Sequence, residues 1–237
     1  MNRVFVGFSP SHQPMAIDTA RRYSPAAYER LRSALVASFV GKRTYGYCKR
    51  FLDFVLALAL IVLVSPVMLA VAFCLGLSSP ASILFCQKRI GQNGREFVCL
   101  KFRTMTPDAP PSCPTGELQG REQYITPIGR FLRRYSLDEL PQLFCVLVGT
   151  MSLVGYRPLV KEDAVCHELR QALGVYRARP GITGYAQLAG RDTVSDQNKA
   201  LLDAYYARNL SLALDIRLLF QTVGAMLSGS GNRDAED

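Results

Sequence analysis

The sequence predicts an α+β fold in which a re-entrant membrane helix precedes a small soluble domain, and three observations lead to this prediction. An apolar run over residues 51–77 has Pro66 at its middle. Two short β-prone segments then flank a turn signal at Asn93-Gly94. Helical patterns with one apolar side follow, so we expect a β-hairpin and several amphipathic interfacial helices in the soluble domain.

The apolar run is long enough for a transmembrane helix, because a straight helix of this length measures about 40 Å and a hydrocarbon core about 30 Å. Pro66 favours a kink instead, since proline removes a backbone donor and clashes with the preceding turn. Ser65 is able to satisfy the carbonyl that Pro66 frees, so Ser65 and Pro66 form the predicted membrane break. Each half then spans about half of the bilayer core.

Charge on both flanks also favours the re-entrant interpretation. A crossing helix usually has its basic residues concentrated on the cytoplasmic side. Here they stand on both sides of the run: Lys42, Arg43, Lys49 and Arg50 before it, and Lys88, Arg89, Arg95, Lys101 and Arg103 after it. We therefore expect residues 46–80 to enter and leave the membrane on its cytoplasmic face.

The other segments complete the expected organisation. Residues 1–45 form an N-terminal extension that is partly helical, with a helix over 26–40; residues 81–228 form a cytoplasmic domain; and residues 229–237 form a disordered tail. Within the domain we expect strands over 82–87 and 97–102, a proline-rich loop over 106–116, and helices over 128–132, 137–148, 161–174 and 201–227. A loop over 149–158 and a turn over 177–184 connect these elements.

Composition narrows the class of partner. The formal net charge is +9, from 28 basic and 19 acidic residues, which suits a partner that carries phosphates. No nucleic-acid-reading motif accompanies the charge, and tryptophan is absent, so anionic lipid or a nucleotide is favoured and nucleic acid is not. Seven cysteines without a C-x-x-C pair predict neither a disulfide framework nor a zinc site.

Asp138 and Glu139 are the most informative residues of the chain. An isolated Asp-Glu pair is usually a helix-start feature. This pair lies in a basic neighbourhood made by Lys101, Arg130, Arg133, Arg134, Arg157 and Lys161. On a chain that enters a membrane, such a pair predicts chemistry on a phosphate, because a carboxylate can attack phosphorus and another can bind Mg²⁺.

Several motifs taken together resemble the bacterial sugar transferase family, the monotopic phosphoglycosyl transferases, in their minimal short form. The match runs from about residue 49 to 227 in the family's order and spacing. The motifs are Lys49-Arg50-Phe51-Leu52-Asp53, Ser65-Pro66, Gln87-Lys88-Arg89-Ile90-Gly91, Lys101-Phe102-Arg103-Thr104-Met105, Ile128-Gly129-Arg130-Phe131-Leu132-Arg133, the segment 136–143, Met151-Ser152-Leu153-Val154-Gly155, Arg157-Pro158, Arg179-Pro180-Gly181-Ile182-Thr183-Gly184 and Asp203-x-Tyr205-Tyr206.

The resemblance implies transfer of a sugar-1-phosphate from a nucleotide diphosphate sugar, expected to be a UDP-sugar, to polyprenyl (undecaprenyl) phosphate. The implied setting is the cytoplasmic leaflet of the bacterial inner membrane, with residues 81–228 as the catalytic domain. Asp138 would be the nucleophile and Glu139 the ligand of Mg²⁺. The implied substrate-binding residues are Lys101, Arg103, Arg133, Arg157, Pro158, Arg179, Pro180 and Gly181. Lys101 is therefore expected within reach of the same phosphates as Asp138.

Departures from the family pattern leave alternatives open. Tyr156 stands where the family usually has proline, Thr150 where Asp is usual, and Cys145 and Ala189 where Asn is usual. A catalytically inactive membrane scaffold and an anionic-lipid-binding module are the alternatives to an enzyme. The retained acid pair and Arg157 favour the enzyme. The sequence identifies neither the sugar nor the glycan pathway, and it leaves a homodimer open.

Overall fold

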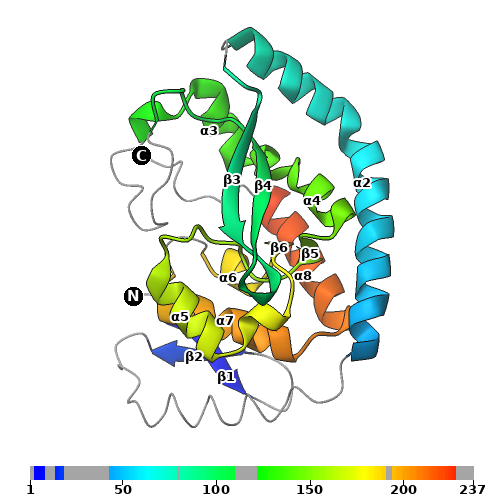
Figure 1. The fold of residues 1–237 in the computed structure, drawn as a ribbon, viewed down its shortest axis with the longest axis vertical. Helices are drawn as coiled ribbons and strands as arrows, with labels where there is room; N and C mark the ends of the chain where they lie inside the picture. The colour runs from blue at the N-terminus through cyan, green and yellow to red at the C-terminus, as the bar shows by residue number, and fades with distance from the viewer. Residues whose placement is uncertain are drawn as a thin grey trace.

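The computed structural model describes residues 3–8, 14–18, 43–78, 81–109, 122–190 and 194–227. The expected helix over 26–40, most of the proline-rich loop and the C-terminal tail lie outside these residues. Figure 1 shows one long helix, α2, along one side of a body that the elements from β3 to α8 form. The mixture of helices and strands confirms the predicted α+β class. A short antiparallel pair, β1 (Arg3–Phe8) and β2 (Pro14–Asp18), was not expected in the N-terminal extension.

Helix α2 (Arg43–Ser78) contains Pro66 without being interrupted by it. Ser65 Oγ donates a hydrogen bond of 2.8 Å to the Val62 carbonyl. The helix changes direction between its two halves, so the expected break is a bend in a continuous helix (Figure 1). In the described part of the chain, α2 is the one helix long and apolar enough to cross a membrane.

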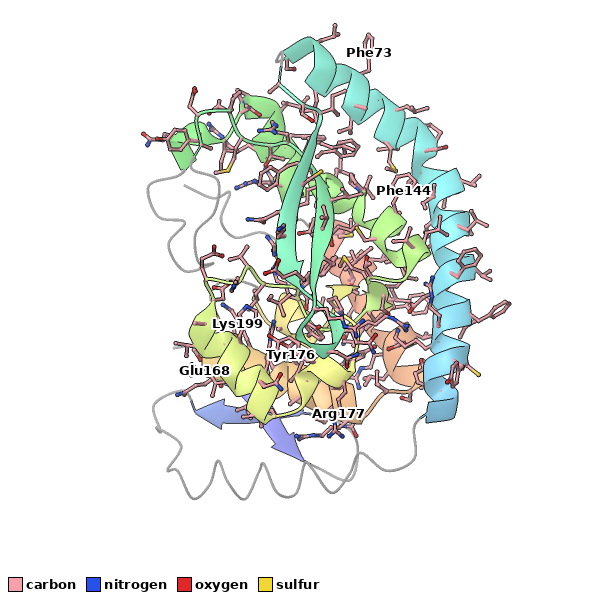
Figure 2. All side chains as sticks on the ribbon, viewed as in Figure 1. Phe73, Phe144, Glu168, Tyr176, Arg177 and Lys199 are labelled. Atoms are coloured by element: carbon pink, nitrogen blue, oxygen red, sulfur yellow. The ribbon has the colours of Figure 1, made fainter. Side chains whose placement is uncertain are left out.

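Both halves of α2 pack on the same body. Ala57 of the first half lies in a core cluster with residues of α4 and α8. Val71 and Leu75 of the second half lie in a cluster with Phe102 and Leu132. The opposite side of α2 is apolar and exposed, and Figure 2 shows Phe73 pointing away from the body.

Polar contacts fix the start of α2 as well. Asp53 is buried and accepts hydrogen bonds from Ser152 Oγ at 2.7 Å and from Leu153 N at 3.2 Å. Lys49 Nζ lies 2.6 Å from Asp215 Oδ2, and Tyr45 OH donates to the same oxygen at 2.8 Å. A charged group buried in this way needs such partners, so the start of α2 is an integral part of the body.

The predicted β-hairpin is confirmed. Strands β3 (Leu84–Ile90) and β4 (Glu96–Phe102) pair antiparallel, from Leu84 opposite Phe102 to Ile90 opposite Glu96. The short helix η2 (Gln92–Gly94) forms the turn, where Asn93 and Gly94 adopt φ angles of 59° and 72°. These left-handed values are what an Asn-Gly turn supplies at low cost.

The segment that carries the acid pair is not one helix over 137–148, as expected. After η4 (Glu122–Tyr124) and α3 (Pro127–Arg134), residues Leu137–Glu139 form a single 3₁₀ turn, η5, and Gln142–Val148 form α4. Pro141 separates the two because it has no backbone N–H to continue the hydrogen-bond ladder, and it suits the position before a helix.

A small parallel sheet was missed. Strands β5 (Ser152–Val154) and β6 (Gly181–Thr183) pair where a loop and a turn were expected. The crossover between them contains α5 (Ala164–Ala172), within the expected helix, and the short η6 (Val175–Arg177). Helix α6 (Tyr185–Leu188) follows directly.

The expected single helix over 201–227 is wrong. The structure has two helices, α7 (Asp196–Arg208) and α8 (Leu212–Leu227). Asn209 ends the first, and Ser211 Oγ accepts from Leu214 N at the start of the second, as a helix N-cap does. Helix α7 is almost fully buried, whereas α8 exposes Phe220 and Val223. The apolar residues of α7 therefore belong to the core, and part of those of α8 lie on the surface.

Candidate active site

The acid pair lies on the turn η5, next to the hairpin. Ser136, which precedes the turn, adopts a left-handed backbone with φ of 55°. The turn buries both carboxylates, leaving Asp138 8 % and Glu139 6 % exposed. On both sides of the pair, Leu137 and Leu140 pack against the cluster that contains Val71 and Leu75 of α2. The pair is therefore held between the soluble body and the second half of the apolar helix.

Two basic side chains neutralise the buried carboxylates. Lys101 Nζ, from β4, lies 2.8 Å from Glu139 Oε1 and 4.0 Å from Asp138 Oδ2. Arg157 Nη1 lies 3.4 Å from the same oxygen of Glu139. The prediction that Lys101 reaches the position of Asp138 is confirmed. Since buried charges require partners, the site brings together two anions and two cations in a small space.

Arg89 is a neighbour of this site that the sequence interpretation did not place there. It donates to Gln87 Oε1 on its own strand and to the carbonyl of Pro158. Burial lowers the pKa of Arg89, with Arg157 contributing in the same direction. Arg89 therefore ties the hairpin to the segment that carries Arg157 and Pro158. Arg89 and Gln87 are two residues apart in a strand, so their side chains lie on the same face of the hairpin. This spacing is the sequence signal that could have placed the two side chains together.

Arg133 and Arg103 lie on elements close to the acid pair. Arg133 Nε donates to Thr104 Oγ1 at 2.9 Å, which links α3 to the end of β4. Arg103 Nε donates to the Ser82 carbonyl at 2.9 Å, and its guanidinium lies 5.8 Å from the centroid of the Phe85 ring. These two contacts join Arg103 to the base of the hairpin.

Arg179, Pro180 and Gly181 lie at the small parallel sheet. The Pro180 carbonyl accepts a hydrogen bond from Ser152 N, and Gly181 N donates to the Tyr156 carbonyl, each at 2.8 Å. Burial lowers the pKa of Arg179, helped by Arg50 of α2. Pro180 and Gly181 therefore have a structural role, because their backbone pairs with the segment that leads to Arg157.

The carboxylates offer oxygen ligands of the kind that Mg²⁺ prefers. Among the described residues, no group of three or more His, Cys, Asp or Glu side chains is close enough to hold a metal ion. Asp138 and Glu139 together provide two carboxylates at most. Such a set fits Mg²⁺ only in the common arrangement in which substrate phosphates supply further ligands.

Comparison with known proteins identifies the family. Residues 44–229 match the family model described as bacterial sugar transferase. The chain belongs to the bacterial sugar transferase family. It is therefore an enzyme of that family, and the resemblance inferred from the motifs is confirmed.

Three relatives illustrate the match. The chain is 35 % identical over 222 residues to the exopolysaccharide production protein ExoY of Sinorhizobium fredii, covering 85 % of this chain and 97 % of the relative. It is 34 % identical to the UDP-N-acetylgalactosamine-undecaprenyl-phosphate N-acetylgalactosaminephosphotransferase of Aeromonas hydrophila, covering 86 % of this chain and 49 % of the relative. It is 33 % identical to the undecaprenyl-phosphate galactose phosphotransferase of Salmonella typhimurium, covering 81 % of this chain and 43 % of the relative. The chain thus spans nearly all of ExoY and about half of the other two.

Three of the four residues that depart from the usual sugar transferase pattern make specific contacts in the structure. Thr150 Oγ1 donates to the Cys145 carbonyl at 3.1 Å, at the end of α4. Cys145 Sγ lies 3.6 Å from the Val98 carbonyl of the hairpin. Tyr156 is fully buried and packs edge-on against Tyr176. Nothing in the structure explains Ala189, which ends α6.

Tyr156→Phe should stabilise the protein. Burial raises the pKa of Tyr156, so its hydroxyl stays protonated, yet that hydroxyl has no hydrogen-bond partner in the described part of the chain. A buried polar group without a partner costs about 1–3 kcal/mol. Thermal unfolding in detergent should therefore show a Tm higher by roughly 2–12 °C. A lower Tm would mean that the hydroxyl is hydrogen-bonded, for instance through an ordered water.

Proposed function

We propose that this protein transfers a sugar-1-phosphate from a UDP-sugar to undecaprenyl phosphate and releases UMP. The observation that carries the proposal is the buried acid pair, which lies between two cations and the apolar helix α2. A membrane-lipid phosphate and a water-soluble diphosphate have to meet at such a boundary. The names of the relatives from Aeromonas hydrophila and Salmonella typhimurium, both undecaprenyl-phosphate sugar phosphotransferases, support the same reaction.

The proposed route has two displacements at one phosphorus atom. A carboxylate oxygen of Asp138 attacks the phosphorus that carries the sugar, and an O–P bond forms as the bridging P–O bond to UMP breaks. UMP leaves with the electron pair of that bond. A phosphate oxygen of undecaprenyl phosphate then attacks the same phosphorus and displaces the Asp138 carboxylate, which is regenerated.

Cationic side chains make the first attack feasible, since an anionic nucleophile approaches an anionic diphosphate. Lys101 lies within ion-pair distance of both carboxylates, and Arg157 lies beside Glu139. Both are placed to stabilise charge that develops on the phosphoryl oxygens. Glu139 would hold Mg²⁺ together with oxygens of the substrate, and the bound ion would neutralise the diphosphate.

We further propose that α2 is re-entrant and that the enzyme faces the cytoplasm from the inner membrane. A crossing helix would carry its second half to the far side of the bilayer. Instead, Val71 and Leu75 pack with Phe102 and Leu132, while Asp53 is bound by Ser152 of the same body. Contacts of both halves with one body support a membrane that lies on a single side of the protein. Exposed apolar residues of α2 and α8 would then enter the bilayer.

Labelling of introduced cysteines tests this topology. Gly46→Cys and Ser82→Cys place thiols just inside the start and just beyond the end of α2. In a background with Cys113 and the exposed Cys48, Cys74 and Cys86 replaced by serine, both thiols should react only after a reagent gains access to the cytoplasm. Labelling from opposite sides of the membrane would contradict the re-entrant arrangement. Pro66→Leu should straighten the helix and move part of the population to that second result.

A screen of UDP-sugars tests the reaction. Purified protein in detergent is incubated with undecaprenyl phosphate, Mg²⁺ and one UDP-sugar at a time, and UMP release is measured. One sugar or a few should give UMP together with a lipid-linked sugar diphosphate. A folded protein that releases no nucleoside monophosphate from any UDP-sugar or other nucleotide sugar would favour the inactive scaffold.

A further inference from the structure

A fully buried ion pair lies behind Arg157. Arg170 of α5 and Asp203 of α7 are 0 % and 1 % exposed, and Arg170 Nη2 lies 2.6 Å from Asp203 Oδ2. Removing two charges from water is expensive, and apolar replacements of such pairs are often equally stable or more stable. A contribution to folding stability is therefore not a sufficient reason for an Arg170–Asp203 ion pair in the core.

Two other contacts of Arg170 connect the pair to the active site. Its Nη1 donates a hydrogen bond of 2.9 Å to the carbonyl of Arg157. Its guanidinium also lies over the ring of Tyr156, 5.2 Å from the centroid. Residues 157–163 belong to no helix or strand, so this hydrogen bond anchors a segment that lacks a regular ladder.

The Arg157 side chain extends from this anchored backbone to the acid pair, where its Nη1 lies 3.4 Å from Glu139 Oε1. Asp203 thus fixes the orientation of one guanidinium, and that guanidinium fixes the backbone from which a second one starts. Arginine suits this task because its planar fork binds two acceptors at once in fixed directions, which lysine does not do.

We propose that Arg170 and Asp203 are positioning residues that hold the Arg157 guanidinium at the acid pair. The inference rests on the proposed function only through the role of Arg157. Asp203 is the first residue of the Asp203-x-Tyr205-Tyr206 motif. Its ion pair with Arg170 gives an acidic residue at this position a role in the active site. Tyr206, at the end of the motif, lies 2.8 Å from the Val154 carbonyl and belongs to the separate network around Asp215.

The test replaces the pair by apolar residues of similar size, Arg170→Met with Asp203→Leu, in the full chain. Because a buried ion pair is often replaced without loss of stability, Tm should stay close to that of the wild type. The initial rate of UMP release should fall by about 10²-fold, the loss expected when a catalytic group is misplaced by about 1 Å. The fall should lie mainly in kcat, since Arg157 acts on charge that develops in the transition state.

A control removes an ion pair elsewhere in the molecule. Lys88→Gln with Glu96→Gln abolishes an exposed contact of 3.9 Å on the hairpin, and neither partner contacts Arg157, Arg170 or Asp203 in the described part of the chain. This control should change the rate by less than about twofold, as expected for a site not coupled to Arg157.

A double-mutant cycle separates positioning from a general structural role. In an Arg157→Gln background, the Met/Leu replacement should have almost no additional effect on the residual rate, because the residue to be positioned is gone. Should the apolar variant not fold, Asp203→Asn, which keeps the shape and an acceptor, is measured in the same cycle.

A stable apolar variant with wild-type kcat would overturn the inference, and so would equal losses with and without Arg157. Absence of UMP release from the wild-type protein would instead refute the proposed function. The two failures are therefore distinguishable.

Discussion

Asp138→Asn should abolish turnover, whereas Glu139→Gln should reduce it without abolishing it. The Asn side chain keeps the shape of Asp138 but has no anionic oxygen to attack phosphorus, so no phospho-sugar can form on the protein. Glu139→Gln removes a charge that Lys101 and Arg157 both contact, and with it the expected ligand of Mg²⁺. The two substitutions should therefore have different effects: one removes the nucleophile, and the other weakens metal binding.

Intact-protein mass spectrometry separates the two roles. Wild-type protein incubated with its UDP-sugar, without the lipid acceptor, should gain the mass of one sugar phosphate. Glu139→Gln should gain it slowly, with a higher Mg²⁺ requirement, and Asp138→Asn should not gain it at all. Near-normal turnover of Asp138→Asn would replace the covalent route by direct transfer between the two substrates.

Gly181→Ala should destabilise the protein and abolish activity, because Gly181 lies where the two strands of the small parallel sheet approach closely. A Cβ at this position would lie 2.0 Å from the backbone nitrogen of Gly155, and a Cβ at Gly155 would lie 2.3 Å from the Arg179 carbonyl. Backbone cannot yield as a flexible side chain does, so the cost is on the order of 3 kcal/mol. The segments of Arg157 and Arg179 would have to separate.

Thermal unfolding and UMP release measured together check this prediction. Tm should fall by roughly 6–12 °C for Gly181→Ala. Gly224→Ala is the matched control, because Gly224 lies inside α8 with open space around it. Alanine there should stabilise the helix by about 1 kcal/mol and leave activity unchanged. An unaltered Tm for Gly181→Ala would show that the close approach of the two segments is not required.

Local chemistry decided which elements could be predicted from the sequence. The hairpin combines alternating strands with an Asn-Gly turn, and both signals lie within a few residues. The acid pair and Lys101 were assigned from residue type and family motifs, and the structure places them together. Strands β5 and β6 gave no signal of this kind, because each has three mostly buried residues and its partner lies far away in sequence.

Long-range contacts account for the residues that were missed. Arginine in an amphipathic helix usually lies on the surface, so no sequence signal indicated that Arg170 is buried. Only the packing of α7 against α5 places Asp203 beside it. Arg89 likewise acquires its role from the Pro158 carbonyl, which the crossover after β5 brings to the hairpin. The break between α7 and α8 had a local signal in Asn209 and Ser211, which a continuous apolar pattern concealed.

The packing of α2 has a practical consequence for work with this enzyme. Val71 and Leu75 complete the apolar layer under Leu137 and Leu140, and Asp53 supplies the acceptor for Ser152. A fragment that began at Ser82 would expose that layer to water and leave the buried Ser152 hydroxyl without this acceptor. We therefore expect a protein that lacks residues 1–81 to aggregate instead of giving a water-soluble enzyme. Purification, crystallisation and inhibitor screening all need the whole molecule in detergent or nanodiscs.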